Sequence, residues 1–178
     1  MINFKIAETE DYEKLVPFFI ENDLEFSEEE PVPTDLVKCW EIVENVDAEE
    51  QLLKRRDAKR ATGAADALDS SDESRGYSRL IGGFVLAKRE GEFIVDGIAI
   101  APDYRKHKLG RVLLNKGIEE TLKQGGSRIF LVARAPGFFR KAGFVTVPRE
   151  EAPNFFECLT CPQYGVDCHP EVMRLDLA

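Results

Sequence analysis

The stretch from Ile94 to Leu114 constrains the fold of this chain more than any other part. A run of β-branched and other apolar residues stops at a Pro102-Asp103 turn, a basic loop with one glycine follows, and a helical pattern then begins. Strand, basic loop and helix N-terminus in this order favour pyrophosphate binding, because free backbone N–H groups and the positive end of the helix dipole face the anion. The stretch therefore predicts an α/β fold with an anion site at this loop.

The loop is unusually basic for a chain whose net charge is −9. Cationic side chains beside a helix N-terminus reinforce the attraction of a phosphate group. The candidate phosphate-binding residues are the basic residues Arg105, Lys106, His107, Lys108 and Arg111, together with Leu109 and Gly110 between them.

The composition is typical of one soluble globular domain. A chain of 178 residues with 43% hydrophobic and 32% charged residues can bury a full core. Its apolar runs are too short to span a bilayer and its first residues lack a signal-peptide pattern, so we expect a cytoplasmic protein without a membrane partner. The acidic pI, near 4.9, argues against nucleic acid as a main partner, because phosphate neutralisation needs a broad basic face.

Periodicity of the apolar residues predicts alternating strands and helices. Proline at position 17 should kink or interrupt the first helix, and Arg89-Glu-Gly-Glu92 should form a hairpin turn. The order gives an α/β domain with a mixed central sheet and helices on both faces. Predicted strands are 3–6, 36–43, 80–88, Glu92–Ile100, Arg128–Ala133, 144–147 and 172–177; predicted helices are 7–21, one that begins near Leu109 and ends at Gly125-Gly126, and Pro136–Lys141.

Residues 45–79 read as an insertion in this single domain of residues 1–178. Residues 47–60 place acids early and bases late, which suits a solvated helix. Residues 61–77 are rich in Ala, Asp, Ser and Gly, so we expect them to be mobile. The basic cluster that begins at Lys54 is either a charged helix face, which we favour, or a docking patch.

The segment 158–169 is rich in cysteine. Cys158-x-x-Cys161 has the spacing of a zinc half-site, but the adjacent Cys168 and His169 would tend to point apart. We therefore expect packed, inert thiols and assign no metal, with a zinc site as the alternative.

The basic loop resembles the acetyl-CoA-binding motif of the GNAT acyltransferase superfamily, Arg/Gln-x-x-Gly-x-Gly/Ala. Arg105 and Gly110 match this motif, and Lys108 stands in the place of its first glycine. The run from Ala135 to Phe144 resembles the superfamily segment Ala-x-x-Phe-Tyr-x-x-x-Gly-Phe.

The hairpin of residues 82–99 and the cysteine-rich tail are similar to those of small bacterial N-acetylglutamate synthases of the GNAT type. The resemblance implies that strands Glu92–Ile100 and Arg128–Ala133 splay into a V and that the pantetheine arm of acetyl-CoA lies between them. It makes the backbone of Ile98, Ala99 and Ile100 the expected contacts. The implied activity is acetyl transfer from acetyl-CoA to a small-molecule amine such as glutamate.

Acetyl transfer to an amine requires removal of a proton from the amine and favours protonation of the leaving thiolate. Asp96 lies within an apolar strand, at the position where many superfamily members carry a carboxylate base. Its alternative role is that of a structural, hydrogen-bonded acid. Glu92 is the second candidate base, with Glu90 beside it, although both also suit solvated turn acids.

The superfamily tyrosine that commonly protonates the thiolate is replaced here by Phe139. Tyr164 or a water molecule could serve instead, or the thiolate leaves unprotonated. An amino-acid acceptor also needs a cation for its carboxylate, and Arg89 and Arg134 are the candidates.

Two other functions fit the same residues. Phe139 and Lys108 suit a GNAT fold that binds CoA without turnover. The charged insertion suits an acetyltransferase that docks on a protein substrate. The sequence is compatible with an oligomer and leaves the acceptor open.

Overall fold

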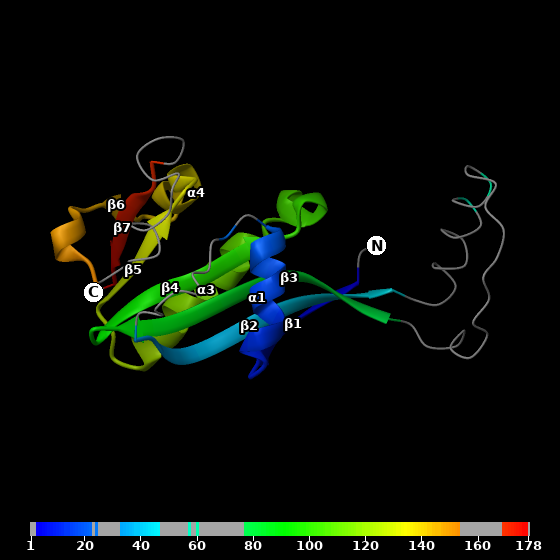
Figure 1. Cartoon of the computed structure of the whole chain (residues 1–178), viewed down its shortest axis with the longest axis horizontal. Coiled ribbons are helices and arrows are strands. Elements are labelled where there is room, and N and C mark those ends of the chain that lie inside the picture. The colour runs from blue at the N-terminus through cyan, green and yellow to red at the C-terminus, as the bar shows by residue number, and fades with distance from the viewer. Residues whose placement is uncertain are drawn as a thin grey trace.

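The computed structural model describes residues 3–22, 24, 33–46, 57, 60, 77–153 and 169–177. Within these ranges the chain forms one mixed seven-stranded sheet in the order β1-β2-β3-β4-β5-β7-β6 (Figure 1). The β4–β5 pair is parallel and the other pairs are antiparallel. The strands are β1 (Phe4–Thr9), β2 (Asp35–Val46), β3 (Tyr77–Arg89), β4 (Glu92–Ile100), β5 (Arg128–Ala133), β6 (Val145–Thr146) and β7 (Glu171–Asp176).

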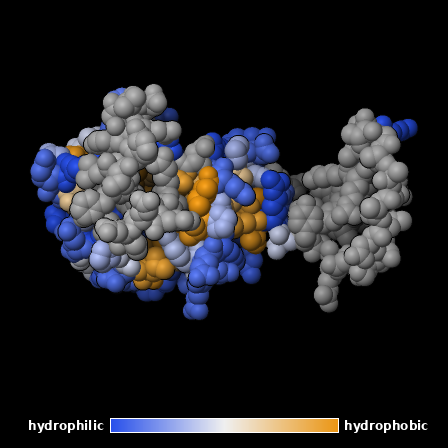
Figure 2. Space-filling view, viewed as in Figure 1, coloured by the Kyte–Doolittle hydropathy of each residue, from blue (hydrophilic) through white to orange (hydrophobic). Residues whose placement is uncertain are grey.

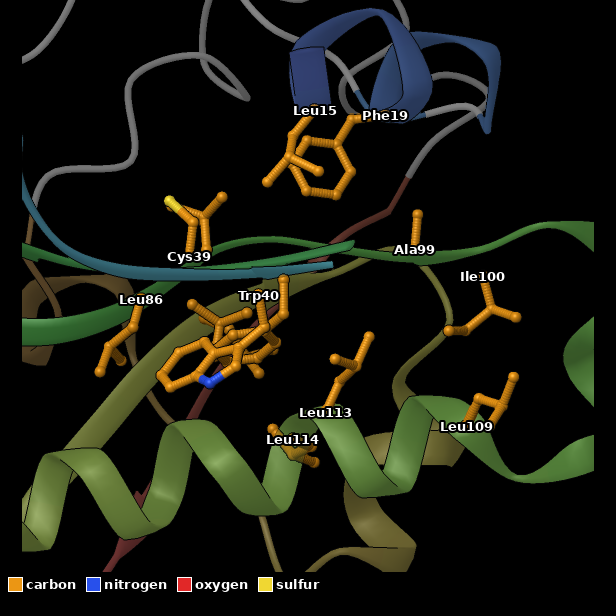
Figure 3. Packing of buried hydrophobic residues seen from close by; sticks show 14 of the residues in the cluster. Leu15, Phe19, Cys39, Trp40, Leu86, Ala99, Ile100, Leu109, Leu113 and Leu114 are labelled. Carbon is orange, nitrogen blue, oxygen red and sulfur yellow. The ribbon is translucent and has the colours of Figure 1, made fainter. Parts of the chain in front are cut away.

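Helices cover both faces of this sheet, as predicted. Figure 3 shows Leu15 and Phe19 of α1 (Tyr12–Glu21) on one face, and Leu113 and Leu114 of α3 (Leu109–Lys123) on the other. All four side chains are fully buried, so the sheet is the middle layer of a three-layer core. The remaining helices are short: η1 (Pro102–His107), α4 (Pro136–Lys141) and η2 (Arg149–Glu151).

The first helix begins later than the sequence predicted. Residues 7–9 continue β1 and pair with β2, and the Asp11 side chain caps α1 by accepting a hydrogen bond from the Lys14 N–H at 3.1 Å. Of the two effects predicted for Pro17, the interruption was wrong, because α1 continues past it, and the kink stays a prediction. Both Pro17 and Glu13, whose carbonyl loses its usual donor, are exposed, so water can satisfy that carbonyl.

The other predicted elements are confirmed, with ends that move by a few residues. The β3–β4 turn has positive φ at Glu90 (51°) and Gly91 (78°), the conformation that a tight two-residue hairpin requires. Strands β2 and β3 reach into both ends of the predicted insertion, to Val46 and from Tyr77. Most of the insertion lies outside the described residues; Asp57 and Arg60, which are described, are helical.

Two glycines let α1 lie close to the sheet. A Cβ atom at Gly97 would lie 2.9 Å from the Phe19 ring, and one at Gly83 would lie 3.1 Å from Leu15. Real side chains essentially never make the first contact, so a larger residue at Gly97 would push α1 away. The glycines therefore set the height of α1 above β3 and β4, and with it the position of the first residue of α1, Tyr12.

The surface seen in Figure 2 carries its hydrophobic residues in separate patches with hydrophilic side chains between them. Ile20, at 55% exposed, is the most exposed of the large hydrophobic residues in the described part of the chain. Isolated exposed residues of this kind are normal in a soluble fold. No helix among the described residues is long and apolar enough to cross a membrane.

Candidate active site

The opening between β4 and β5 is the first feature of the site. The two strands pair only at Phe93 with Ile129 and at Ile94 with Phe130. On its other side, β5 pairs with β7 along its whole length. In the described part of the chain, no strand therefore pairs with the β5-facing edge of β4 from Val95 to Ile100. The V-shaped opening that the sequence predicted is confirmed.

A β-bulge places Asp96 just beyond the point where the strands separate. Val95 pairs with Leu86 and Gly97 pairs with Val85, so Asp96 is the extra residue on β4. A bulge bends its strand, leaves the extra residue out of the ladder and re-aims its side chain. Asp96 and Gly97 both meet the α1 side of the sheet, where the Asp96 carboxylate contacts side chains from other elements.

Arg89 and Tyr12 both hold the Asp96 carboxylate. Arg89 Nη2 lies 3.2 Å from Asp96 Oδ1, and the Tyr12 hydroxyl donates to Asp96 Oδ2 at 3.5 Å. Arg89 in turn donates from Nε to the Thr34 hydroxyl oxygen at 2.8 Å. The side chains of Arg89 and Asp96 are only 6% and 10% exposed, so little water screens their attraction. These four residues are called the acyl-end cluster below.

Burial and the Asp96 charge keep two neighbouring acids protonated. Burial first, and then the Asp96 carboxylate, raises the pKa of Tyr12 to about 12. The same two causes in the same order raise the pKa of Cys39 to about 11. Cys39 is therefore a buried thiol at neutral pH and is poorly suited to act as a nucleophile.

The basic loop forms the other end of the site. It ends at Lys108, whose φ of 58° is left-handed, and α3 begins at the next residue. The N-cap residue Lys108 makes no capping hydrogen bond with its side chain, and the first turn of α3 contains no acid. Among the described residues, the N-terminus of α3 is thus surrounded by exposed basic residues of the loop and carries the positive end of the helix dipole. Figure 1 shows the loop running from the end of β4 into α3. The exposed basic side chains are Arg105, Lys106, His107, Lys108 and Arg111.

Two hydrogen bonds fix the loop to the sheet. Arg105 donates from Nε to the carbonyl oxygen of Ile100 at 3.0 Å. The buried Tyr104 donates to the Glu44 carboxylate at the far end of β2, and this bond, followed by burial, raises the pKa of Tyr104 to about 12. The loop is thus exposed but anchored.

The remaining residues predicted to bind the cofactor differ in how exposed they are. Those with buried side chains can offer a cofactor only their backbone groups. Leu109, Ala99 and Ile100 bury their side chains, and Figure 3 shows Ala99 and Ile100 on opposite faces of the sheet. Ile98 is partly buried and packs against the core. At Gly110, an added Cβ would make ordinary contacts, 3.4 Å to Phe138 and 3.7 Å to Ile100.

Glu92, the second candidate base, lies at the closed end of the V. It forms a two-pronged ion pair with Arg128, with Arg128 Nε 3.0 Å from Glu92 Oε2. This end is where β4 and β5 still pair, so the structure does not bring Glu92 and Asp96 into one cluster. Glu90 lies in the exposed hairpin turn.

The two candidate carboxylate-binding arginines lie apart. Arg89 is buried and contacts Asp96, whereas Arg134 is exposed just past the end of β5. The parallel register, continued from Ile94 and Phe130, places Arg134 across the opening from Ile98.

Phe139 is partly buried and packs against the core with two other aromatic rings. Its ring makes T-shaped contacts with Phe138 at 5.0 Å and with Phe144 at 5.7 Å between centroids. It has no O–H group, so this position offers no proton donor. The alternative donor Tyr164 and the cysteines at 158, 161 and 168 lie outside the described residues. Within the described part of the chain, no three His, Cys, Asp or Glu side chains group as metal ligands.

Sequence reasoning missed Tyr12 and Thr34. Tyr12 lies on the same helical face as Leu15 and Phe19, and the periodicity that predicted this helix counts it only as an apolar position. The signal was the hydroxyl, because a buried tyrosine normally finds a polar partner. Nothing local marks Thr34, whose partner Arg89 is 55 residues away.

A family comparison now decides the class of this fold. The model of the acetyltransferase (GNAT) family matches residues 22–144. The chain belongs to the GNAT acetyltransferase family. This range contains the β4–β5 opening, the basic loop and the aromatic segment, and the family that the sequence predicted is confirmed.

Individual relatives of this GNAT chain are distant. An uncharacterized N-acetyltransferase of Chlorobaculum tepidum is 24% identical over 71 residues, which are 39% of this chain and 46% of the relative. The match therefore spans less than half of that protein.

Two solved structures share the fold. The ribosomal-protein-S18-alanine N-acetyltransferase of Escherichia coli is 15% identical, with a TM-score of 0.54 over 99% of this chain and 95% of that one. The N-acetylglutamate synthase of Neisseria gonorrhoeae, complexed with coenzyme A and N-acetyl-glutamate, is 15% identical, with a TM-score of 0.56 over all of this chain and 35% of that one. At these identities the likeness shows the GNAT fold alone.

Proposed function

We propose that this chain transfers the acetyl group of acetyl-CoA to the primary amine of a small amino acid, such as glutamate, with Asp96 as the base. The observation that carries the proposal is the position of Asp96, on a bulge at the point where β4 leaves β5. A carboxylate there lies at the start of the β4 edge that β5 leaves unpaired, just beyond the last paired residue, Ile94. The basic loop lies at the other end of that edge, beyond Ile100.

The residues along this edge fit acetyl-CoA. The uncapped N-terminus of α3 and the exposed cations of the loop suit its pyrophosphate. The edge from Ile98 to Ile100 suits the amide groups of the pantetheine arm, since in the described chain no strand pairs with it. Four residues of strand, about 13 Å, separate Ile100 from Asp96. An arm that starts at the loop and follows β4 therefore brings the acyl end to Gly97 and Asp96.

Asp96 would take the proton that the amine loses. Its Oδ1 is held by Arg89 and its Oδ2 faces the Tyr12 hydroxyl, so the carboxylate is held in one orientation. A positioned base of this kind typically contributes 10²–10⁴ in rate. Glu92 is a weaker candidate, because Arg128 engages both of its oxygens at the closed end of the sheet.

The carboxylate of an amino-acid acceptor would pair with an arginine. Arg134 is exposed at the open end of the V, on the β5 side. Arg89 lies against Asp96, so an acceptor carboxylate bound there would have to share the guanidinium with Asp96. Of the two candidates, Arg134 is more accessible to a substrate.

The proposal is tested by thiol release from acetyl-CoA across a panel of amines. The panel contains glutamate, 4-aminobutyrate, which is glutamate without its α-carboxylate, other amino acids, a diamine and a short peptide with a free α-amine. We expect release with glutamate or another amino acid and much less with its decarboxylated partner. Release only with the peptide would favour a protein substrate and contradict the proposal.

One observation favours a second function, CoA binding without turnover. Phe139 has no O–H and packs among aromatic rings, so the position of the superfamily proton donor is chemically inert. In the same assay, a binding module would gain thermal stability with acetyl-CoA and release no thiol with any amine.

A further inference from the structure

We propose that the Tyr12 hydroxyl supplies the proton that the CoA thiolate takes up on leaving, in place of the hydroxyl that Phe139 lacks. This inference rests on the proposed acetyl transfer and adds a catalytic residue to it. Tyr12 lies in the first turn of α1, far in sequence from every motif of the family. It reaches the site only through the fold.

Tyr12 is well placed as a donor. Its hydroxyl oxygen lies 3.5 Å from Asp96 Oδ2, at the long end of the hydrogen-bond range, so the O–H can turn from Asp96 to a group that enters the opening. The Thr34 hydroxyl oxygen accepts a hydrogen bond from Arg89 Nε at 2.8 Å. The Tyr12 hydroxyl instead donates to the candidate base itself.

The packing of α1 beside the bulge also fixes Tyr12. Leu15 and Phe19, one and two turns further along α1, are fully buried. They lie against Gly83 of β3 and Gly97 of β4, the residue that follows Asp96. The phenol and the carboxylate thus approach each other across one tightly packed layer, and their separation is set by the core.

The protons balance without an outside donor. Starting from the neutral amine, the nitrogen attacks the thioester carbonyl and loses one proton to Asp96. The C–S bond breaks, and the sulfur takes the Tyr12 proton. The protonated Asp96 then returns a proton to the Tyr12 oxygen. The amide and the free thiol are formed, and both residues end in their starting states.

The electrostatics of the pair support this order. Burial, and then the negative charge of Asp96, raises the pKa of Tyr12 to about 12, so its proton is in place at neutral pH. A phenol that is so weak an acid is a poor proton donor to a thiolate. Once Asp96 has taken the amine proton, the charge that helped to raise the pKa of Tyr12 is gone. Proton transfer from Tyr12 thus becomes easier as the thiolate forms.

The test uses the full chain, acetyl-CoA and the most active amine of the panel. Tyr12→Phe keeps the ring that packs on the core and removes only the hydroxyl. We expect kcat to fall by about 10²-fold with little change in the KM for acetyl-CoA. Thr146→Val serves as the matched control, because it removes a hydroxyl that donates to the Glu171 carboxylate on the far strands β6 and β7, at 2.6 Å. Its kcat should equal that of the parent.

Restoring the superfamily donor separates a proton donor from a positioning residue. Adding Phe139→Tyr to Tyr12→Phe should raise kcat at least tenfold, since it restores the phenol that the superfamily carries at this position. An unchanged kcat for Tyr12→Phe would overturn the inference. A loss that Phe139→Tyr leaves in place, in a variant with the parent's melting temperature, would also overturn it and leave Tyr12 as a residue that positions Asp96. A parent protein that releases no thiol with any amine would overturn the proposed function itself.

Discussion

The acyl-end cluster and the basic loop are the two ends of one strand edge, yet they are built in opposite ways. The cluster is buried: Arg89 and Asp96 are 6% and 10% exposed, and each of its contacts joins side chains from different elements. The loop exposes its cations, and it is anchored by Arg105 on a backbone carbonyl and by Tyr104 on Glu44.

In the proposed function, this difference separates the residues that carry the chemistry from the residues that bind the cofactor. Low exposure strengthens electrostatic interactions and holds catalytic groups in place. Exposed cations instead attract a phosphate from a distance and are screened by salt. Changes at the cluster should therefore alter kcat and stability, whereas changes at the loop should alter affinity for acetyl-CoA.

The largest effect is expected for Asp96→Asn. This variant keeps the size and a hydrogen-bond acceptor but removes the base, so turnover should fall by about 10²–10⁴. Acetyl-CoA should still raise the melting temperature as in the parent, because the loop and the β4 backbone are unchanged. An Asp96→Asn protein with the parent's turnover and pH–rate profile would falsify the role of Asp96 and direct attention to Glu92.

A control must separate this loss from unfolding. Asp96→Asn removes the carboxylate that pairs with the buried Arg89 guanidinium, which can cost about 3–5 kcal/mol of stability. Adding Arg89→Met removes that charge and should recover the melting temperature without recovering turnover. Recovery of turnover would mean that Asp96 acts only as a structural partner of Arg89.

The next effect is at the loop. Arg105→Ala together with Arg111→Ala should raise the KM for acetyl-CoA by about 10–100-fold, as expected for one or two lost charge-assisted bonds. The kcat should stay near that of the parent, and the dependence of KM on salt should weaken. Lys116→Ala together with Lys123→Ala removes the same charge from later turns of α3 and should leave KM unchanged. Equal effects of the two pairs would contradict a local phosphate site.

The same contrast explains how much the sequence could predict. The loop and its flanking elements are formed by residues that are adjacent in sequence. The run from Ile94 to Leu114 was therefore enough to predict the strand before the loop, its cations and the helix after it. The strand edge followed from the family resemblance. The acyl-end cluster depends on pairs 55 and 84 residues apart, Thr34 with Arg89 and Tyr12 with Asp96, and no local pattern encodes them. Asp96 was predicted, but its partners required the fold.

Two glycines offer a comparison of packing at the two ends. An alanine Cβ at Gly97 would lie 2.9 Å from the Phe19 ring, so Gly97→Ala must displace α1 and should cost about 1–3 kcal/mol. The melting temperature should fall by several degrees. At Gly110, inside α3, the nearest atom would lie 3.4 Å away, and alanine favours the helix by up to about 1 kcal/mol. Gly110→Ala should thus melt no lower than the parent; a large loss there would contradict the packing described.

The smallest effect is the response of stability to alkaline pH. The pKa of Tyr12 is raised to about 12 and that of Cys39 to about 11, both by burial first and then by the Asp96 charge. At the loop, the bond to Glu44, and then burial, raises the pKa of Tyr104 to about 12. Because the unfolded chain loses these protons at lower pH, the stabilisation is complete below about pH 9 and is lost as the pH rises through 11 to 12. Melting temperatures should therefore fall between pH 8 and pH 12.

The two ends can be compared by removing these groups. Tyr12→Phe combined with Cys39→Ala should reduce the fall in melting temperature more than Tyr104→Phe, since the cluster contributes two such groups and the loop one. Equal flattening would mean that the two ends titrate alike.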